Sequence, residues 1–134
     1  MTAAAPASTA SIAQELVTLC RAGRNLEAIS KFYSPKIVSV EPVGSESMPA
    51  EMTGIEAIRG KNEWWFANNE VHKSEATGPF VGEGQFAVRY AFDVTSKPTG
   101  QRFQMEEMAL YTVKDGKIVR EQFFYNMPGN EPGA

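Results

Sequence analysis

The stretch RFQMEEMALYTVKDGKIVREQFFY, residues 102–125, consists of two runs rich in β-branched and aromatic residues. Between them stands Lys114-Asp-Gly-Lys117, and an Asp-Gly pair between two such runs is a strong signal for a tight β-hairpin. Two further runs of strand composition precede it, at residues 71–77 and 85–95. The second half of the chain therefore predicts a four-stranded antiparallel meander.

The first half of the chain has helical patterns instead. Ser11-Ile-Ala-Gln14 has the spacing of a capping box and opens a first helix, which Gly23 ends. Asn25 is expected to cap a second helix, which stops at Ser34-Pro35. Thr53-Gly-Ile-Glu56 is a second capping box and opens a third helix.

A short strand is expected between the second and third helices, from Lys36 to Glu41, ended by Pro42. The element order is then ααβαββββ, which predicts an α+β fold with three N-terminal helices on one face of a curved, mostly antiparallel sheet. One domain is expected over residues 11–126. Residues 1–10 are expected to be a disordered leader, and residues 127–134 a flexible tail, because neither can bury much apolar surface.

Composition excludes several classes of function. The 134 residues carry a net charge of −3 and no dense Lys/Arg cluster, so nucleic acid is not an expected partner. No apolar run is long enough to span a membrane, and no secretory signal opens the chain, so we expect a cytoplasmic protein without membrane contact. There is no nucleotide-binding glycine motif and no metal-ligand cluster, so neither a cofactor nor a metal is predicted. Cys20 is the only cysteine and is expected to be a small core residue.

Strand periodicity predicts which side chains face the concave side of the sheet, where a pocket would lie, because residues two apart share a face and the concave face should be the apolar one. On residues 102–114 the odd positions are the more apolar set: Phe103, Met105, Glu107, Ala109, Tyr111 and Val113. On the last strand the odd set is again slightly more apolar: Val119, Glu121, Phe123 and Tyr125. Glu107 and Glu121 thus each interrupt an inward-facing row.

A carboxylate among apolar side chains shifts its pKa upward, pairs with a base or contacts water. Two or three around one cavity would separate each other's pKa values, which is what a general acid and a general base need near neutral pH. Two other interpretations stay open. A bulge could reverse the assigned face, or each glutamate could pair structurally with Arg89, Arg120 or Lys61.

The stretch Val38-Ser-Val-Glu-Pro-Val-Gly-Ser-Glu46, with two helices before it and one after, resembles the nuclear-transport-factor-2-like superfamily in its SnoaL-like and ketosteroid-isomerase-like branch. Asp115-Gly-Lys-Ile-Val119 at the last strand adds to the resemblance, which covers residues 11–126. It implies a cystatin-like cone, a homodimer and a small-molecule cavity. It also implies a catalytic carboxylate at Glu41, immediately before the Pro-Val-Gly run.

Other family positions do not carry over. The isomerases' oxyanion-hole tyrosine falls on or beside Leu16, and their second acid falls at Ala109 or Met108, none of which can donate the required hydrogen bond. The Arg-x-Asp pair of the epoxide-hydrolase branch has no counterpart in residues 102–114, and its last-strand Asp aligns with Phe123. A steroid-isomerase mechanism with the family's own residues is therefore not expected.

Two functions stay open at this point. The first is a SnoaL-like protein that binds a small hydrophobic molecule and catalyses an acid/base isomerisation, cyclisation or dehydration of a carbonyl compound, with Glu41 as the base and Glu121 or Glu107 as the acid. The second is a non-catalytic ligand-binding or dimerisation module; a binding cavity should measure several hundred Å³. Ligand-contacting side chains are expected at Asn62, Trp65, His72, Tyr90, Tyr111, Phe123 and Tyr125, although Asn62 could instead bond the backbone and His72 could lie at the surface. The apolar row Met108, Leu110, Ile118 and Phe124 is expected on the outer sheet face, as a dimer contact.

Overall fold

A computed structural model describes residues 7–126 and confirms the α+β prediction. The helices are α1 (Thr9–Arg21), α2 (Asn25–Phe32) and α3 (Ile55–Asn68). The strands are β1 (Tyr33–Val40), β2 (Glu51–Thr53), β3 (Asn69–Val81), β4 (Gln85–Ser96), β5 (Arg102–Lys114) and β6 (Lys117–Phe124). They form one sheet in the order β2-β1-β6-β5-β4-β3, antiparallel except for the parallel β1–β6 pair. The short β2 was not predicted.

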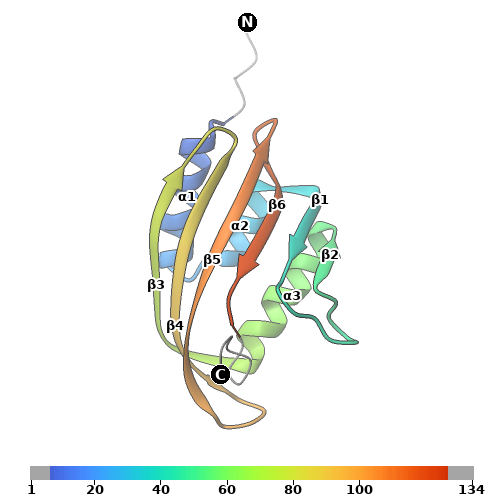
Figure 1. Cartoon of the computed structure of the whole chain (residues 1–134), viewed down its shortest axis with the longest axis vertical. Coiled ribbons are helices and arrows are strands. Elements are labelled where there is room, and N and C mark those ends of the chain that lie inside the picture. The colour runs from blue at the N-terminus through green and yellow to red at the C-terminus, as the bar shows by residue number, and fades with distance from the viewer. Residues whose placement is uncertain (1–6, 127–134) are drawn as a thin grey trace, which may run out of the picture.

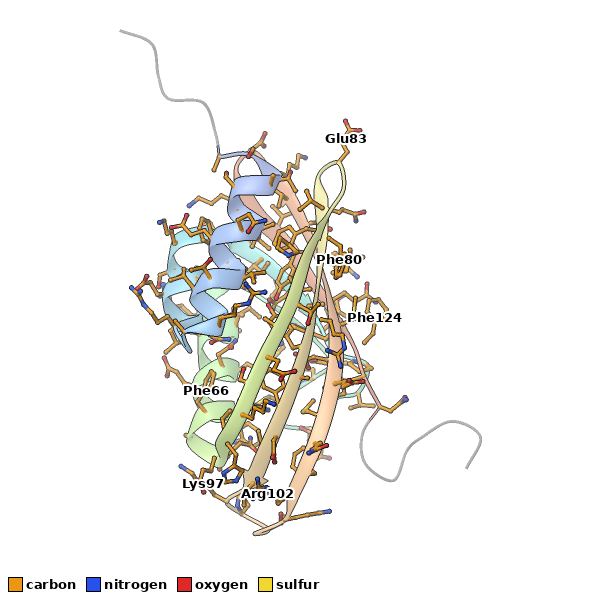
Figure 2. All side chains as sticks on the ribbon, turned by 90° about the vertical axis from the view of Figure 1, so that its left-hand side faces the viewer. Phe66, Phe80, Glu83, Lys97, Arg102 and Phe124 are labelled. Carbon is orange, nitrogen blue, oxygen red and sulfur yellow. The ribbon has the colours of Figure 1, made fainter. Side chains whose placement is uncertain are left out.

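All three helices cover the same face of the sheet (Figures 1 and 2). α1 lies over β3 and β4, and α3 lies beside β1 and β2 (Figure 1). The fully buried side chains between the layers include Ile12, Leu16, Ile37, Ile58 and Phe86. No helix within residues 7–126 is long and apolar enough to cross a membrane.

The Asp115-Gly116 hairpin is confirmed. Both residues have positive φ, 53° and 75°, as a two-residue type I′ turn requires. The end of α1 is also as expected: Gly23, at φ 74°, donates its N–H to Cys20, and Arg24 donates its N–H to Leu19 at 2.8 Å. These two bonds form a Schellman motif.

The predicted helix caps are wrong by one to three residues. Ser8 caps α1, because its hydroxyl accepts a hydrogen bond from the Ser11 N–H at 3.1 Å. Thr9 and Ala10 therefore belong to the helix rather than to a leader. Asn25 is the first residue of α2, not its cap, and α3 follows Gly54 without a side-chain cap. The expectations for residues 1–6 and 127–134 lie outside the described residues.

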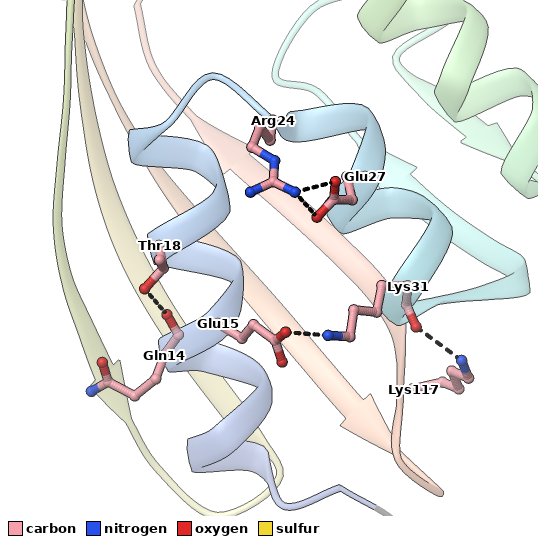
Figure 3. Close-up of polar contacts among 7 residues, drawn as sticks. All are labelled: Gln14, Glu15, Thr18, Arg24, Glu27, Lys31 and Lys117. Carbon is pink, nitrogen blue, oxygen red and sulfur yellow. Dashed lines mark hydrogen bonds and ion pairs between the residues drawn. The ribbon is translucent and has the colours of Figure 1, made fainter.

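Polar contacts tie α1 to α2 and α2 to the sheet on the exposed side (Figure 3). Lys31 pairs with Glu15, and its backbone carbonyl accepts a hydrogen bond from the Lys117 ammonium at 3.0 Å. Exposed pairs of this kind stabilise a fold by at most about 1 kcal/mol. The two helices are therefore held mainly by the apolar core beneath them.

The assigned faces of β6 need one correction. The pairing of β5 with β6 shifts between Thr112 and Val113, where β6 carries an extra residue. This bulge turns Ile118 inward, and Ile118 is fully buried in the core rather than on the outer face. Beyond the bulge the prediction is confirmed at Glu121, which is buried, and at Phe124, which is exposed.

Candidate functional site

A cavity of about 150 Å³ lies between the three helices and the sheet. Nine of the residues expected at the site line it: Glu41, Asn62, Trp65, Tyr90, Glu107, Tyr111, Glu121, Phe123 and Tyr125. The structure therefore brings the three glutamates into one space, although they lie on three different strands or strand ends. The volume of the cavity is smaller than the several hundred Å³ expected for a binding cavity.

Strand periodicity explains how these side chains converge. On β5, Met105, Glu107 and Tyr111 point into the cavity, while Glu106 on the opposite face pairs with Arg89 outside. The pairing of β4 with β5 runs without a shift from Gln85 to Thr95, so alternation holds along this whole stretch. The structural alternative for Glu107, in which it forms an ion pair with Arg89, is therefore wrong.

Glu121 is the best-bonded of the three glutamates. It is fully buried; the Tyr33 hydroxyl donates to its Oε1, and the Ser39 hydroxyl donates to its Oε2 at 2.6 Å. Burial raises the pKa of Glu121, whereas the Lys61 charge and these two hydrogen bonds oppose the rise. Both carboxyl oxygens are engaged by the protein itself, which favours a structural role.

Lys61 on α3 connects Glu121 to Glu41. Its ammonium donates to the Ser39 hydroxyl at 2.7 Å and to Glu41 Oε1 at 3.1 Å, and it lies 5.4 Å from the centre of the Phe123 ring. Only 12% of the Lys61 side chain and 21% of the Glu41 side chain are exposed, so the pair is largely desolvated. The ion pair with Lys61, one of the partners expected for the glutamates, is thus confirmed for Glu41.

One oxygen of Glu41 has no partner. Glu41 follows the last residue of β1, and its backbone N–H donates a hydrogen bond to the Ala50 carbonyl at 2.8 Å. With Oε1 held by Lys61, Oε2 is buried and has no partner at hydrogen-bond distance among residues 7–126; the Tyr125 hydroxyl lies nearby, and burial and the Glu41 carboxylate raise the pKa of that hydroxyl. A buried carboxylate oxygen without a donor is costly. This oxygen is the basic atom of the site that is available to an added molecule.

Glu107 differs from Glu41 because burial favours its protonated form. Burial raises the pKa of Glu107 to about 8, and the charges of Glu41 and Glu121 add to the rise, while Lys61 opposes it. No hydrogen bond to its carboxyl group is present within the described residues. At pH 7 Glu107 is therefore mainly a neutral carboxylic acid, which can donate a proton or a hydrogen bond into the cavity.

Tyrosine hydroxyls line the remaining polar wall. Tyr90 and Tyr111 share a hydrogen bond of 2.8 Å, and the Tyr90 hydroxyl lies 3.8 Å from the Cys20 sulfur. Burial raises the pKa of both tyrosines and raises the pKa of Cys20 to about 11. The thiol is therefore protonated at neutral pH, as expected for a core cysteine rather than a nucleophile.

Aromatic rings form the apolar wall. Trp65 packs edge-on against Phe66 with centroids 5.1 Å apart and contacts Phe92 at 5.3 Å. Asn62 donates its amide to the Ile58 carbonyl at 3.0 Å, so the backbone interpretation of this residue is confirmed. A flat apolar group fits against such rings.

His72 does not line the cavity. It is exposed on β3, where its Nε2 lies 2.7 Å from the Thr95 hydroxyl. Conversely, Ser39 and Tyr33 belong to the site network and were not predicted, although Ser39 stands two residues before Glu41 and so on the same strand face. Within residues 7–126 no three His, Cys, Asp or Glu side chains lie close enough to hold a metal ion.

The three helices and the curved sheet thus enclose a cavity that three glutamates line. The sequence profile of the SnoaL-like domain matches residues 7–125, and the chain belongs to this family. A search of curated protein sequences found no match.

Solved structures agree with the assignment. A protein of Mesorhizobium loti, provisionally described as a SnoaL-like polyketide cyclase, is 43% identical with a TM-score of 0.84, covering 89% of this chain and 100% of the other. A protein of Catenulispora acidiphila with a ketosteroid-isomerase-like fold, solved with trimethylamine, is 19% identical with a TM-score of 0.70, covering 92% and 91%. A Xanthomonas campestris protein with a cystatin-like fold is 16% identical with a TM-score of 0.73, covering 92% and 95%. The expected cystatin-like fold and SnoaL-like membership are thus confirmed.

Proposed function

We propose that the protein catalyses proton transfer next to the carbonyl group of a small, largely apolar compound, using its own side chains as acid and base. Such a transfer is the first step common to isomerisation, cyclisation and dehydration of carbonyl compounds. The observation that carries the proposal is the contrast between two glutamates in one cavity. Glu41 presents a buried oxygen without a donor, and Glu107 has a pKa of about 8 and holds a proton at pH 7.

The proposed step balances as a keto–enol conversion. Glu41 Oε2 takes a proton from the carbon beside the carbonyl, and the electron pair of that C–H bond forms the C=C bond of the enol. Glu107 gives its proton to the carbonyl oxygen as negative charge develops there. Glu121 is not the acid in this scheme, because its oxygens already accept hydrogen bonds from Tyr33 and Ser39.

The cavity volume limits the part of the substrate that enters. A volume of about 150 Å³ is the size that holds one benzene ring, so a fused polycycle would extend beyond this cavity. A ring-sized ketone is therefore the class of compound to test first. The aromatic wall of Trp65 and Phe92 would contact its flat face.

Deuterium exchange tests the proposal without knowledge of the natural substrate. Acetophenone and cyclohexanone, incubated with the protein in D2O at pD 7, should lose their α-proton signals in the ¹H NMR spectrum faster than without protein. Glu41→Gln keeps the shape but removes the base, so exchange should fall by roughly 10² or more while the fold is retained. Glu46→Gln, an exposed carboxylate outside the cavity, is the matched control. Binding of the ketones without exchange would favour the non-catalytic binding module.

We also propose that two copies of the chain pair through the outer face of the sheet. Met108 is 39% exposed and Phe124 is 50% exposed, and the two are paired neighbours on β5 and β6. Phe80 and Phe124 project from the side of the sheet that the helices leave uncovered (Figure 2). A dimeric mass by light scattering at micromolar concentration, and a monomeric mass for Met108→Glu, would support this; a monomeric wild type would contradict it.

A further inference from the structure

A second, larger hollow adjoins the cavity. It has a volume of about 470 Å³ and lies where the turn between α1 and α2 meets the end of α3, β3 and β4. Five residues line both spaces: Cys20, Asn25, Phe66, Tyr90 and Phe92. The two spaces therefore adjoin along these residues, and a ligand that reached from one into the other would have only its inner end limited by the volume of the cavity.

The two spaces differ in charge. The cavity is lined by Glu41, Glu107, Glu121 and one ammonium, that of Lys61. The lining of the hollow contains no carboxylate but includes the cations Arg21 and Lys73, with the imidazole of His72 beside them. Two of these three already have side-chain partners, because Lys73 pairs with Glu75 at 3.0 Å and His72 contacts Thr95.

Arg21 is the cation of the hollow that has no acidic partner among residues 7–126. Its Nε and Nη2 donate to the Ala76 carbonyl at 3.1 and 2.9 Å, which holds the guanidinium against β3. Nη1 makes no hydrogen bond within the described residues, and no carboxylate neutralises the charge. A guanidinium fixed on one side and open on the other is suited to a carboxylate or phosphate.

A second feature of the same rim favours an anion. α2 begins at Asn25, which lines both spaces, and no side chain caps this helix start. The free N–H groups of a first helical turn carry partial positive charge, which the Glu27 carboxylate in this turn, itself paired with Arg24, offsets in part. The cavity, in contrast, offers an anion only one cation, Lys61, and Glu41 already pairs with it.

We propose that the ligand is a ring-sized carbonyl compound bearing a carboxylate, with the ring in the cavity and the carboxylate in the hollow at Arg21. This inference rests on the proposed function and adds a substrate class and an orientation to it. The charges of the two spaces select one direction of entry. The neutral carbonyl end approaches Glu41 and Glu107, and the anionic end stays at Arg21.

Three matched probes test the orientation: 3-(4-acetylphenyl)propanoate, its uncharged propanamide and the corresponding 3-(4-acetylphenyl)propylamine. Calorimetric titration at pH 7 and low salt should give a Kd for the carboxylate about tenfold below that of the amide, with the amine weakest. Arg21→Gln should remove most of the carboxylate's advantage and leave the amide unchanged. Arg24→Gln, which removes a neighbouring arginine already paired with Glu27, should change neither. Higher ionic strength should weaken the carboxylate alone.

The outcomes separate this inference from the proposed function. Equal affinity for carboxylate and amide, tighter binding of the amine, or equal effects of the two arginine substitutions would overturn the carboxylate assignment. Deuterium exchange into the acetyl group of the amide would in that case still support proton transfer in the cavity. Thermal melting of Arg21→Gln checks its fold, and an unchanged Kd for the amide shows that the cavity is intact. Failure of all three probes to bind would overturn both proposals.

Discussion

Glu107→Gln should change the pH dependence of stability, and its effect can be worked out from the structure. The folded-state pKa of Glu107 is raised to about 8 from an ordinary value of 4.5, mainly by burial. Between these two pH values the folded chain retains a proton that the unfolded chain has released. Because the folded state then binds more protons, the free energy of unfolding falls as pH rises.

The slope has a definite size. One proton of difference corresponds to about 1.4 kcal/mol per pH unit, so Glu107 should lower the stability of the wild type by about 3 kcal/mol between pH 5 and pH 7. Glutamine has a similar shape and no titration. The unfolding free energy of Glu107→Gln should therefore fall less steeply, and the variant should be the more stable protein at pH 8.

Urea unfolding at pH 5, 6, 7 and 8 measures the difference directly. Glu106→Gln is the matched control, since this neighbour lies on the outer face, pairs with Arg89 and has 67% of its side chain exposed. It should follow the wild-type slope. Parallel curves for the wild type and Glu107→Gln would mean that Glu107 is ionised in the folded protein, and the acid in the proposed mechanism would be lost.

Three other substitutions probe the structure. Lys61→Met leaves Glu41 and Ser39 without their buried cation and should lower the free energy of unfolding by about 3 kcal/mol in urea, whereas an effect near zero would mean that the pair is solvated. Ile118→Ala should lower it by about 2–5 kcal/mol if the bulge places Ile118 in the core, and by much less if the side chain were on the outer face. Gly23→Ala places a side chain at φ 74° with no atom within 4 Å, so backbone strain alone should lower the free energy of unfolding by about 1–2 kcal/mol and reduce the melting temperature accordingly. An unchanged melting temperature would contradict the left-handed cap.

Much of the site was predictable where strands are regular. β4 and β5 pair without interruption from Gln85 to Thr95, so alternation alone placed Glu107 and Tyr111 on the cavity side. The same argument placed Glu121 correctly on β6 but assigned Ile118 to the wrong face. A bulge inserts one residue without a sequence signal of its own, and each residue before it then changes face. The error was therefore confined to the hairpin end of β6.

Helix α3 shows what periodicity could not provide. Lys61 stands beside Asn62 in the sequence, and a lysine on a helix is usually a solvated surface residue. Its position follows from long-range contacts instead, because β1 brings Ser39 and Glu41 to the ammonium. Such a partner set becomes visible only when the strand and the helix are placed together. The sequence allowed Lys61 as one of three possible partners and could not choose among them.

The three glutamates differ because the protein satisfies their oxygens to different degrees. Glu121 receives a donor at each oxygen, Glu41 receives Lys61 at one oxygen and nothing at the other, and Glu107 receives no donor within the described residues. Hydrogen bonds and a nearby cation stabilise the charged form of a carboxyl group, whereas burial without them stabilises the neutral form. The same residue type can thus serve as a structural anchor, a base and an acid within one cavity. Adding a donor beside Glu107, for instance by Met105→Lys, should lower the pKa of Glu107 and convert the proposed acid into a second base.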